Sequence, residues 1–488
     1  MFTVNTKISY DDYLKKVFGD ELEAFLHHGE LSDFIRVNTL RATLKNVEEV
    51  LSQYGFKTQR VSGVPDALRL LYAPYDPTLT LHHFAGWFVK QSLSSQLPVR
   101  FMDLHPGQTV IDLCAAPGSK TTQIATAMHN TGRLYANDLA GKRMTPLAAR
   151  LDGCLVSHAV LYNKAAERLT QILPPIFDRV LADVPCTGLG NFASLDEHRT
   201  RYERAKNPLA QNELQYRIAL TGCKLLKKGG RLVYSTCSLD PNEDERVVNE
   251  IVSRLPFRMV EMPDIDGISW RHGLTAFDGD AFSPELAKAR RVTPWENDTQ
   301  GFFVAVLEKI DDLPMRFEHV DPQTPKTTIL TADDPTVAPI LENIEHYYGI
   351  PASIFEDYHF VMASRGIHCI DAHWDGIENG YHRAGLCLAK KRGGIWRLSH
   401  AMIQNLGRYI TKNRMELSYE QMAELCATGY TSVKQTPESP YPVMAYGELG
   451  CLGSTYDMQD GHIHWKRPTD FHCIPCLKKN VEQNSPLR

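Results

Sequence analysis

Short apolar segments alternate with helical segments between residues 106 and 309, and this alternation limits the possible folds more than any other feature of the chain. A strand, a helix and a second strand in succession pack as a parallel pair with a right-handed crossover. We therefore predict a doubly wound, mostly parallel, Rossmann-like α/β sheet. The predicted strands are residues 109–113, 133–138, 157–162, 177–184, 230–236 and 301–309, and the predicted helices are residues 119–129, 141–152, 209–227 and 242–254.

The chain has 488 residues, which is too long for one hydrophobic core, so we expect two or three domains. Residues 1–100 mix helical and strand patterns and are predicted to form a small α/β domain. The sheet domain should span residues 101–310. Residues 311–340, rich in Asp, Pro and Thr, are predicted to be an acidic linker. Residues 341–488 contain glycine turns and short strands, which predicts a β-rich C-terminal domain.

The composition is that of an ordinary globular protein, with 43% hydrophobic and 23% charged residues. The N-terminus lacks a basic lead into an apolar core, so no secretory signal is expected, and no apolar run is long enough to span a membrane. Eleven cysteines, an odd number in a chain without a signal, indicate reduced thiols and a cytoplasmic protein. The oligomeric state is left open by these patterns.

The overall charge of −5 conceals two opposite regions. Residues 311–357 carry ten acidic and two basic side chains, whereas residues 381–415 carry eight basic side chains and no acidic one. Aromatic residues are interleaved with the basic ones: Tyr381, Trp396 and Tyr409. This combination favours a surface that follows phosphates and stacks on bases, although a run of charge can also be a solvated face.

A turn of small residues follows the first predicted strand of the sheet and precedes a helix. Such a turn lets a ligand approach the backbone closely, and the amides at the helix start can bind polar groups. The spacing matches neither the dinucleotide fingerprint nor the phosphate loop. The candidate cofactor-binding residues in this turn are Cys114, Ala115, Ala116, Pro117, Gly118, Ser119 and Lys120.

Polar residues also end the next three strands: Asp138, Asn163 and Asp183. Ligands of open parallel sheets bind beyond the carboxyl ends of the strands, so these side chains should lie beside the turn. Asp138 could accept the hydroxyls of a ribose, and Asn163 could meet an adenine edge. An adenosine ligand bound without a phosphate loop favours S-adenosylmethionine over a nucleoside triphosphate or a nicotinamide.

Single cysteines follow the fourth and fifth predicted strands, in DVPCTGLG (183–190) and LVYSTCSLD (232–240). These strands should be neighbours, so Cys186 and Cys237 are predicted to flank one pocket. A thiolate that adds to carbon 6 of cytosine makes carbon 5 nucleophilic. A second group then helps to remove the carbon 5 proton or to release the first thiolate. Two converging thiols therefore fit cytosine methylation.

The chain resembles the Sun/Fmu family of RNA cytosine-5 methyltransferases over about residues 30 to 310. The resemblance implies a class I methyltransferase fold and S-adenosylmethionine as cofactor. It also implies that Cys237 is the nucleophile and that Cys186 serves turnover. Asn163 stands where the family more often has aspartate, and its amide can still pair with adenine. The segments that carry the resemblance are RVNTLR (36–41), LCAAPGSKT (113–121), DVPCTGLG and GRLVYSTCSLDPNEDE (230–245).

The regions outside the sheet have further expected roles. In the family, the Arg-x-Asn-x-Leu motif lies in an RNA-contacting domain, so Arg36 and Asn38 either contact RNA or join that domain to the core. Residues 340–470 are similar in position to the PUA-like RNA-binding domain of the small-subunit rRNA methyltransferase F type. Ribosomal RNA is thus the favoured partner. Transfer RNA is the alternative substrate, and a catalytically silent RNA-binding or assembly factor is the alternative class.

The C-terminal segment holds a cluster of His462, His464, His472, Cys473 and Cys476. One CxxC with nearby histidines can bind zinc, but structural zinc sites usually need a second pair of ligands. We therefore expect no metal in this protein.

Overall fold

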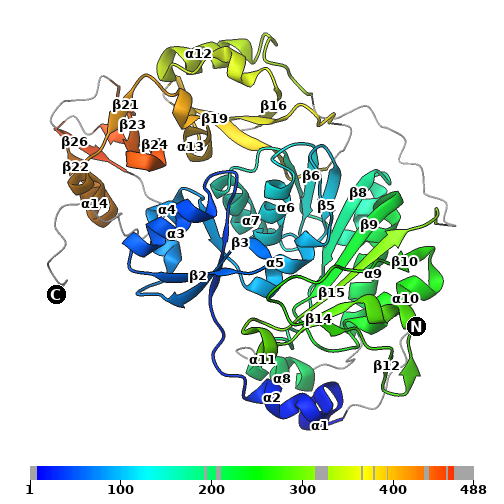
Figure 1. Ribbon diagram of the computed structural model, residues 1–488. Coiled ribbons are helices and arrows are strands. Elements are labelled where there is room, and N and C mark those ends of the chain that lie inside the picture. The colour runs from blue at the N-terminus through cyan, green and yellow to red at the C-terminus, as the bar shows by residue number, and fades with distance from the viewer. Residues whose placement is uncertain are drawn as a thin grey trace.

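The computed structural model describes residues 8–191, 195–204, 210–313, 328–363, 366–376, 380–392, 394–433, 439–457 and 460–465. Its centre is a ten-stranded sheet in the order β11-β14-β15-β9-β8-β5-β6-β7-β18, with β10 paired to β15 (Figure 1). The strands β5 to β9 run parallel, and β15 lies antiparallel to β9. Their bounds are β5 Thr109–Asp112, β6 Arg133–Asn137, β7 Ala159–Tyr162, β8 Phe177–Asp183, β9 Leu226–Thr236, β10 Phe257–Met259, β11 Arg271–His272, β14 Arg290–Val292, β15 Phe302–Lys309 and β18 Arg383–Ala384.

Helices cover both faces of this sheet, because neighbouring residues of each strand point to opposite sides. In β5, Val110 packs with α5, α6 and α7, whereas Ile111 packs with α9 and α10. The predicted Rossmann-like arrangement and its six strands are thereby confirmed. The helices are α5 Leu93–Arg100, α6 Ser119–Ala127, α7 Gly141–Gly153, α8 Leu195–Arg204, α9 Ala210–Leu225, α10 Glu245–Arg254 and α11 Pro294–Asn297, and a small hairpin joins β12 Ala276–Phe277 and β13 Asp280–Ala281.

The N-terminal hundred residues form two separate parts. A four-stranded sheet in the order β2-β3-β1-β4 carries α3 and α4, while α1 and α2 lie apart from it at the bottom of Figure 1. The two helices pack on Leu189 and Leu239, next to the predicted thiol loops. The bounds are α1 Tyr10–Phe18, α2 Leu22–Leu26, β1 Phe34–Val37, α3 Leu44–Gln53, β2 Lys57–Val61, β3 Val64–Tyr72, α4 Leu81–Phe84 and β4 Phe88–Lys90.

Arg36 and Asn38 are buried, and this decides between their two predicted roles. The Arg36 guanidinium donates to Gln91 Oε1 at 2.9 Å and to Thr122 Oγ1 at 2.8 Å. The Asn38 amide donates to the carbonyl oxygens of Gly86 at 2.9 Å and Cys154 at 3.3 Å. Of the two predicted roles, the structure supports the second, because this pair joins the N-terminal sheet to the central domain.

The C-terminal region joins the central sheet through its own strand. β18 pairs with β7, and the Arg383 guanidinium forms an ion pair with Asp152 of α7. Leu330 already bridges Phe360 of this region. The elements are α12 Ala338–Tyr348, β16 Tyr358–Ala363, β17 Gly366–Asp371, β19 Leu386–Arg392, β20 Ile395–Leu398, α13 His400–Leu406, β21 Arg414–Glu416, α14 Tyr419–Thr428, β22 Tyr430–Ser432, β23 Val443–Tyr446, β24 Gly450–Ser454, β25 Tyr456–Asp457 and β26 His462–His464.

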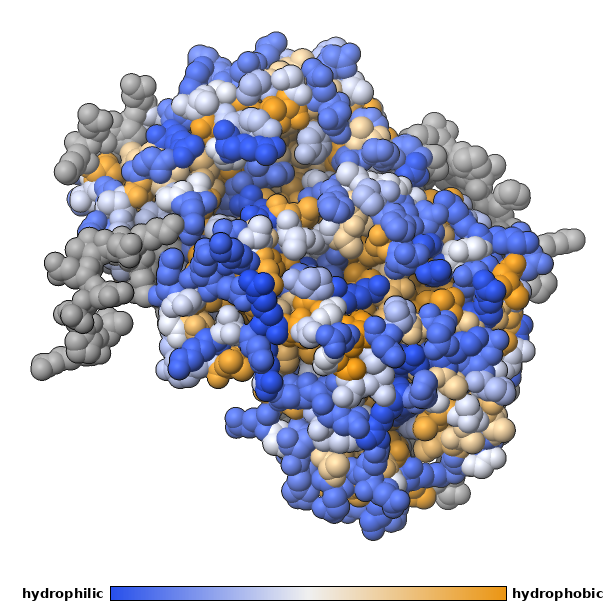
Figure 2. All heavy atoms as spheres, in the orientation of Figure 1, coloured by the Kyte–Doolittle hydropathy of each residue, from blue (hydrophilic) through white to orange (hydrophobic). Residues whose placement is uncertain are grey.

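Some basic side chains of residues 381–415 make contacts within the protein. Arg383 is paired with Asp152, and the Arg397 guanidinium stacks 3.9 Å from the Tyr441 ring centroid. The side chains at residues 390–392, at the end of β19, are exposed. Figure 2 shows that the upper part of this face, where the C-terminal region lies, is mostly hydrophilic.

Among the described residues, no helix is both long and apolar enough to cross a membrane. The described part of the chain also brings together no group of three or more His, Cys, Asp and Glu that could hold a metal. Of the predicted C-terminal cluster, His472, Cys473 and Cys476 lie outside the described residues.

Candidate active site

The two predicted thiols meet at the carboxyl edge of the central sheet. β8 and β9 are parallel neighbours in which Asp183 is in register with Ser235, so the residues that follow them lie side by side. Cys186 Sγ and Cys237 Sγ are 3.0 Å apart. The prediction that the two thiols lie close together is therefore confirmed.

Backbone contacts hold the two thiol loops against each other. Gly190 N donates to Cys237 O at 3.0 Å, and Gly301 N donates to Gly190 O at 2.7 Å. A Cβ atom at Gly190 would lie 2.5 Å from Gly301 O and 2.7 Å from Cys237 O. Because these distances are shorter than any real contact of a Cβ atom, only glycine allows the loops to cross here.

A buried carboxylate, Glu243, ties both loops together from beneath. It accepts hydrogen bonds from Thr187 N at 2.9 Å, Gln215 Nε2 at 2.7 Å and Ser238 Oγ at 3.1 Å. Thr187 follows Cys186 and Ser238 follows Cys237, so one carboxylate supports both thiols. Burial is the main reason why the pKa of Glu243 is raised to about 7.

The surroundings give the two thiols opposite acidities. A hydrogen bond from the Cys186 thiol is the largest cause that lowers the pKa of Cys237, and the nearby Lys120 ammonium also lowers it. The same hydrogen bond, together with burial, raises the pKa of Cys186 well above its ordinary range. Cys237 is thus the thiol that ionises more readily, and Cys186 keeps its proton.

Lys120 and Asp183 form an ion pair directly beside the thiols. Lys120 Nζ lies 2.8 Å from Asp183 Oδ2 and 2.9 Å from Ser95 Oγ. The other Asp183 oxygen accepts a hydrogen bond of 2.7 Å from Ser235 Oγ. The Lys120 ammonium also lies 5.0 Å from the Phe302 ring centroid. These contacts fix the paired charges of Lys120 and Asp183 near Cys237, where the Asp183 carboxylate raises and the Lys120 ammonium lowers the pKa of this thiol.

The predicted cofactor turn lies between β5 and α6. Gly118 precedes α6 with φ of 107°, and a Cβ atom there would lie 3.1 Å from Leu147 Cδ1, so the position favours glycine. Ala115 and Ala116 are nearly buried, while burial raises the pKa of Cys114.

Asp138 and Asn163 lie beside this turn, as predicted, but both are engaged with backbone. Asp138 accepts from Ala116 N at 3.2 Å and Ala140 N at 3.0 Å. The Asn163 amide donates to Asp138 O at 2.8 Å and Leu139 O at 3.0 Å. Its carbonyl oxygen is the part of the Asn163 side chain that can accept a hydrogen bond from a ligand.

Comparisons with known proteins agree with this arrangement. The family described as "16S rRNA methyltransferase RsmB/F" matches residues 99–308. The tRNA (cytosine(49)-C(5))-methyltransferase of Pyrococcus abyssi is 30% identical over 312 residues, which cover 63% of this chain and 96% of that protein. The chain belongs to the RsmB/F family of RNA methyltransferases.

Two further relatives define the extent of the match. The ribosomal RNA small subunit methyltransferase F of Klebsiella pneumoniae is 33% identical over 57% of this chain and 58% of its own length. A methyltransferase homolog protein from Pyrococcus horikoshii superposes with a TM-score of 0.54 at 29% identity, covering 62% of this chain and 94% of that chain. The chain spans about half the length of several other curated RsmB/F relatives that it matches.

Sequence reasoning missed Glu243 and Gln215 as parts of this RsmB/F site. Glu243 belongs to the quoted segment PNEDE, so its acidic run was the available signal. Gln215 lies in the middle of α9, where an isolated glutamine carries no such signal. Only the packing of α9 against the loops reveals that its amide donates to Glu243.

Proposed function

We propose that this chain methylates carbon 5 of cytosine in RNA and that Cys237 is the covalent nucleophile. The observation that carries the proposal is the 3.0 Å separation of the Cys186 and Cys237 sulfur atoms. Two thiols this close are not required for methyl transfer to an amine or an oxygen. They fit a reaction in which a base is activated by addition of one thiol and then released with help from the other.

The residues of this site perform the reaction as follows. The Cys237 thiolate adds to carbon 6 of the cytosine ring, which makes carbon 5 nucleophilic. S-adenosylmethionine, when bound, supplies the electrophilic methyl group that carbon 5 takes up. Cys186 then helps to remove the carbon 5 proton or to expel the Cys237 thiolate, which restores the aromatic ring. Lys120 favours the thiolate through its positive charge.

The residues around the turn fit this cofactor. The helix start of α6, the small residues Ala115 and Ala116 and the open backbone of residues 114–120 can receive an adenosine group and its amino-acid part. Asp138 and Asn163 present oxygen atoms at the ends of the two adjacent strands. Lys120, the last residue of this turn, forms an ion pair with Asp183 at the end of β8, three residues before Cys186.

We favour ribosomal RNA as the substrate, and transfer RNA is the alternative. The matching family is described by its 16S rRNA enzymes, whereas a relative that the chain covers almost completely is named for tRNA. The target cytosine must be unpaired or flipped out, because the thiol reaches carbon 6 from the face of the ring. Both thiols must stay reduced, which supports a reducing compartment such as the cytoplasm.

The C-terminal region is proposed to bind RNA in the manner of a PUA-like domain. Its support is the exposed group Lys390, Lys391 and Arg392 at the end of β19, on the edge hairpin with β20. Arg383 and Arg397 are engaged with Asp152 and Tyr441, and these contacts remove the two side chains from the RNA surface. The RNA surface is therefore smaller than the basic stretch of residues 381–415.

Bisulfite sequencing of total RNA from cells with and without the gene tests this proposal. In cells without the gene, we expect one or a few cytosines, in ribosomal RNA by the favoured proposal, to lose their protection from conversion by bisulfite. A protected cytosine in transfer RNA would select the alternative substrate. If no cytosine changes in any RNA while the purified protein still binds RNA, the protein is a catalytically silent RNA-binding factor instead.

A further inference from the structure

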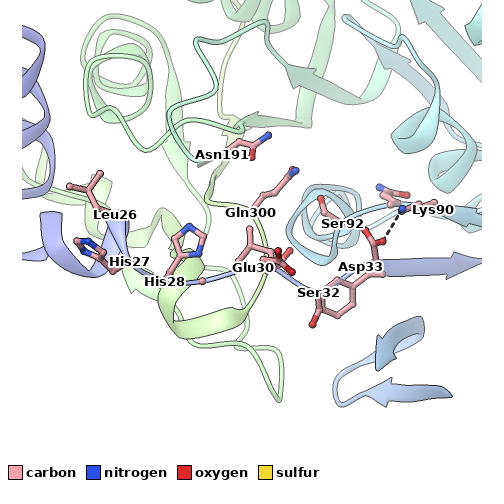
Figure 3. Close-up of a pocket in the computed structure, with 15 residues that line it drawn as sticks. Leu26, His27, His28, Glu30, Ser32, Asp33, Lys90, Ser92, Asn191 and Gln300 are labelled. Atoms are coloured by element: carbon pink, nitrogen blue, oxygen red, sulfur yellow. Dashed lines mark ion pairs between the residues drawn. The ribbon is translucent and has the colours of Figure 1, made fainter. Parts of the chain in front are cut away.

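A separate pocket of about 830 Å³ lies beside the two thiols. Figure 3 shows it between the segment that follows α2, the end of β4 and the two segments that carry Asn191 and Gln300. Neither cysteine and no residue of the cofactor turn lines it. The volume is large enough for a nucleotide. The pocket is thus distinct from the site of the thiols, and Asn191, which follows Gly190 of the Cys186 loop, belongs to its wall.

Two of its side chains come from the loops that carry the reaction. Asn191 follows Gly190, whose backbone N–H donates to Cys237 O. Gln300 precedes Gly301, whose backbone N–H donates to Gly190 O. In Figure 3 the amide ends of Asn191 and Gln300 both point toward the upper right of the view. Whatever fills the pocket is therefore held in fixed register with the thiols.

The opposite wall is also held firmly. Ser32 donates to Asp298 through its backbone N–H at 3.0 Å and through its hydroxyl at 2.6 Å. Arg69 Nε donates to Ser32 Oγ at 2.9 Å. Gln91 N donates to Phe34 O at 3.0 Å. These bonds fix residues 31–34 against the segment that carries Gln300, so the pocket is formed before a ligand arrives.

The chemistry of the lining selects a neutral base rather than a phosphate. Its charged residues are Glu30, Asp33 and Lys90, and Lys90 already lies 2.8 Å from Asp33. A net negative lining disfavours a phosphate group. Carboxamides, by contrast, present a donor and an acceptor together, which is the pattern that reads the edge of a base.

We propose that this pocket binds the base of the nucleotide next to the target cytosine, and that Asn191 and Gln300 read its edge. This proposal rests on the function proposed above. It adds a specificity site, because Asn191 and Gln300 each adjoin a glycine whose backbone bonds hold the thiol loops together. Discrimination by such an amide–base pair is typically about tenfold or more between the right and the wrong base.

The test uses the RNA segment that the protein modifies, remade with each of the four bases at either neighbour of the target cytosine. Methylation rates are measured for the wild type, Asn191→Ala, Gln300→Ala and the control Gln53→Ala. Gln53 is exposed at the end of α3 and does not line the pocket. We expect a preference of about tenfold at one neighbour, reduced to about threefold or less in both pocket variants and kept in the control.

Each outcome bears on one proposal. A wild-type preference that both pocket variants retain, or an absence of preference at either neighbour, overturns the specificity site while the methylation remains. If Asn191→Ala disturbs its loop, Gln300→Ala still decides, because Gln300 lies on a different segment. Absence of methylation by the wild type with every RNA overturns the proposed function itself and, with it, the specificity site.

Discussion

The backbone N–H of Thr187 donates a 2.9 Å hydrogen bond to Glu243 Oε2, and this bond links the loop of one thiol to the segment that follows the other. Gln215 donates to the same oxygen from α9. The other oxygen receives the hydroxyl of Ser238. The separation of the two sulfur atoms therefore depends on a buried group that touches neither of them.

Replacing Glu243 tests this dependence. Glu243→Ala leaves Thr187 N without its acceptor and Gln215 Nε2 with Pro185 O alone, which should lower the free energy of unfolding by about 1–3 kcal/mol. Glu243→Gln should be tolerated, because its carbonyl oxygen can accept the two N–H groups while its amide donates to the hydroxyls of Thr187 and Ser238. Denaturant unfolding and the rate of product release measure both effects. Equal losses of unfolding free energy in Glu243→Ala and Glu243→Gln would contradict a hydrogen-bonding role for Glu243.

The raised pKa of Glu243 also predicts a dependence of stability on pH. Its pKa is about 7 in the folded chain against 4.5 for an ordinary glutamate, so the folded state binds the proton more tightly. Its contribution is therefore fully present below about pH 4.5, falls as the pH rises to about 7 and is constant above that. Relative to Glu243→Gln, the wild type should lose up to about 3 kcal/mol across this window. If the difference in the free energy of unfolding between the wild type and Glu243→Gln does not change with pH, this prediction is contradicted.

Lys120 should favour the ionisation of Cys237. The hydrogen bond from the Cys186 thiol is the main cause that lowers the pKa of Cys237 and the Lys120 charge adds to it, so alkylation of this cysteine by iodoacetamide should reach half its maximal rate below the ordinary pKa of 9.0. In Lys120→Ala the midpoint should move to higher pH. Mass spectrometry of the peptide that contains Cys237 follows the reaction. Lys45→Ala, which removes an exposed lysine from α3, should leave the midpoint in place, and an equal shift in both variants would exclude a local effect.

The proximity of the sulfur atoms predicts a reversible oxidation. Hydrogen peroxide should oxidise the Cys237 thiolate to a sulfenic acid, and the Cys186 thiol should then displace water to form a disulfide. Activity should be lost and should return with dithiothreitol. Peptide mapping should find the two cysteines linked, with the buried Cys154 and Cys223 unchanged. Failure to form this link under mild oxidation would show that the sulfur atoms are farther apart.

The basic end of β19 should supply part of the RNA affinity. Lys390, Lys391 and Arg392 changed together to Ala should weaken RNA binding and reduce the slope of affinity against salt by up to about three. The control changes three exposed lysines on other elements to Ala: Lys45, Lys57 and Lys227. Titrations at several salt concentrations measure both. If the slope of RNA affinity against salt does not change in the first variant, residues 390–392 are a solvated surface that does not bind RNA.

The central sheet and the meeting of the thiols could be predicted because both follow from local patterns. Apolar runs at regular intervals define β5 to β9, and the carboxyl ends of parallel neighbours always share one edge. Topology therefore brings Cys186 and Cys237 to one edge of the sheet, and the contacts of Glu243 and Gly190 then hold their loops together. The burial of Arg36 could not be predicted in the same way, because an arginine in a strand is equally suited to the surface.

Contacts between distant segments were beyond prediction for a related reason. Nothing in the sequence of residues 26–34 indicates that this segment lies against the segments that carry Asn191 and Gln300. Likewise, no sequence pattern shows that β18 extends the central sheet beside β7. The sign of the charge at residues 381–415 was visible, but the pairing of Arg383 with Asp152 was not. Such contacts depend on which surfaces meet after the local elements have formed.

Capture of the covalent complex tests the central claim most directly. Cys186→Ala protein, incubated with RNA and S-adenosylmethionine, should accumulate a protein–RNA adduct that survives denaturing electrophoresis, because the Cys237 thiolate adds but is not released. Cys237→Ala should be inactive and should form no adduct. An adduct that still forms in Cys237→Ala, or its absence in Cys186→Ala, would contradict the assignment of Cys237 as the nucleophile.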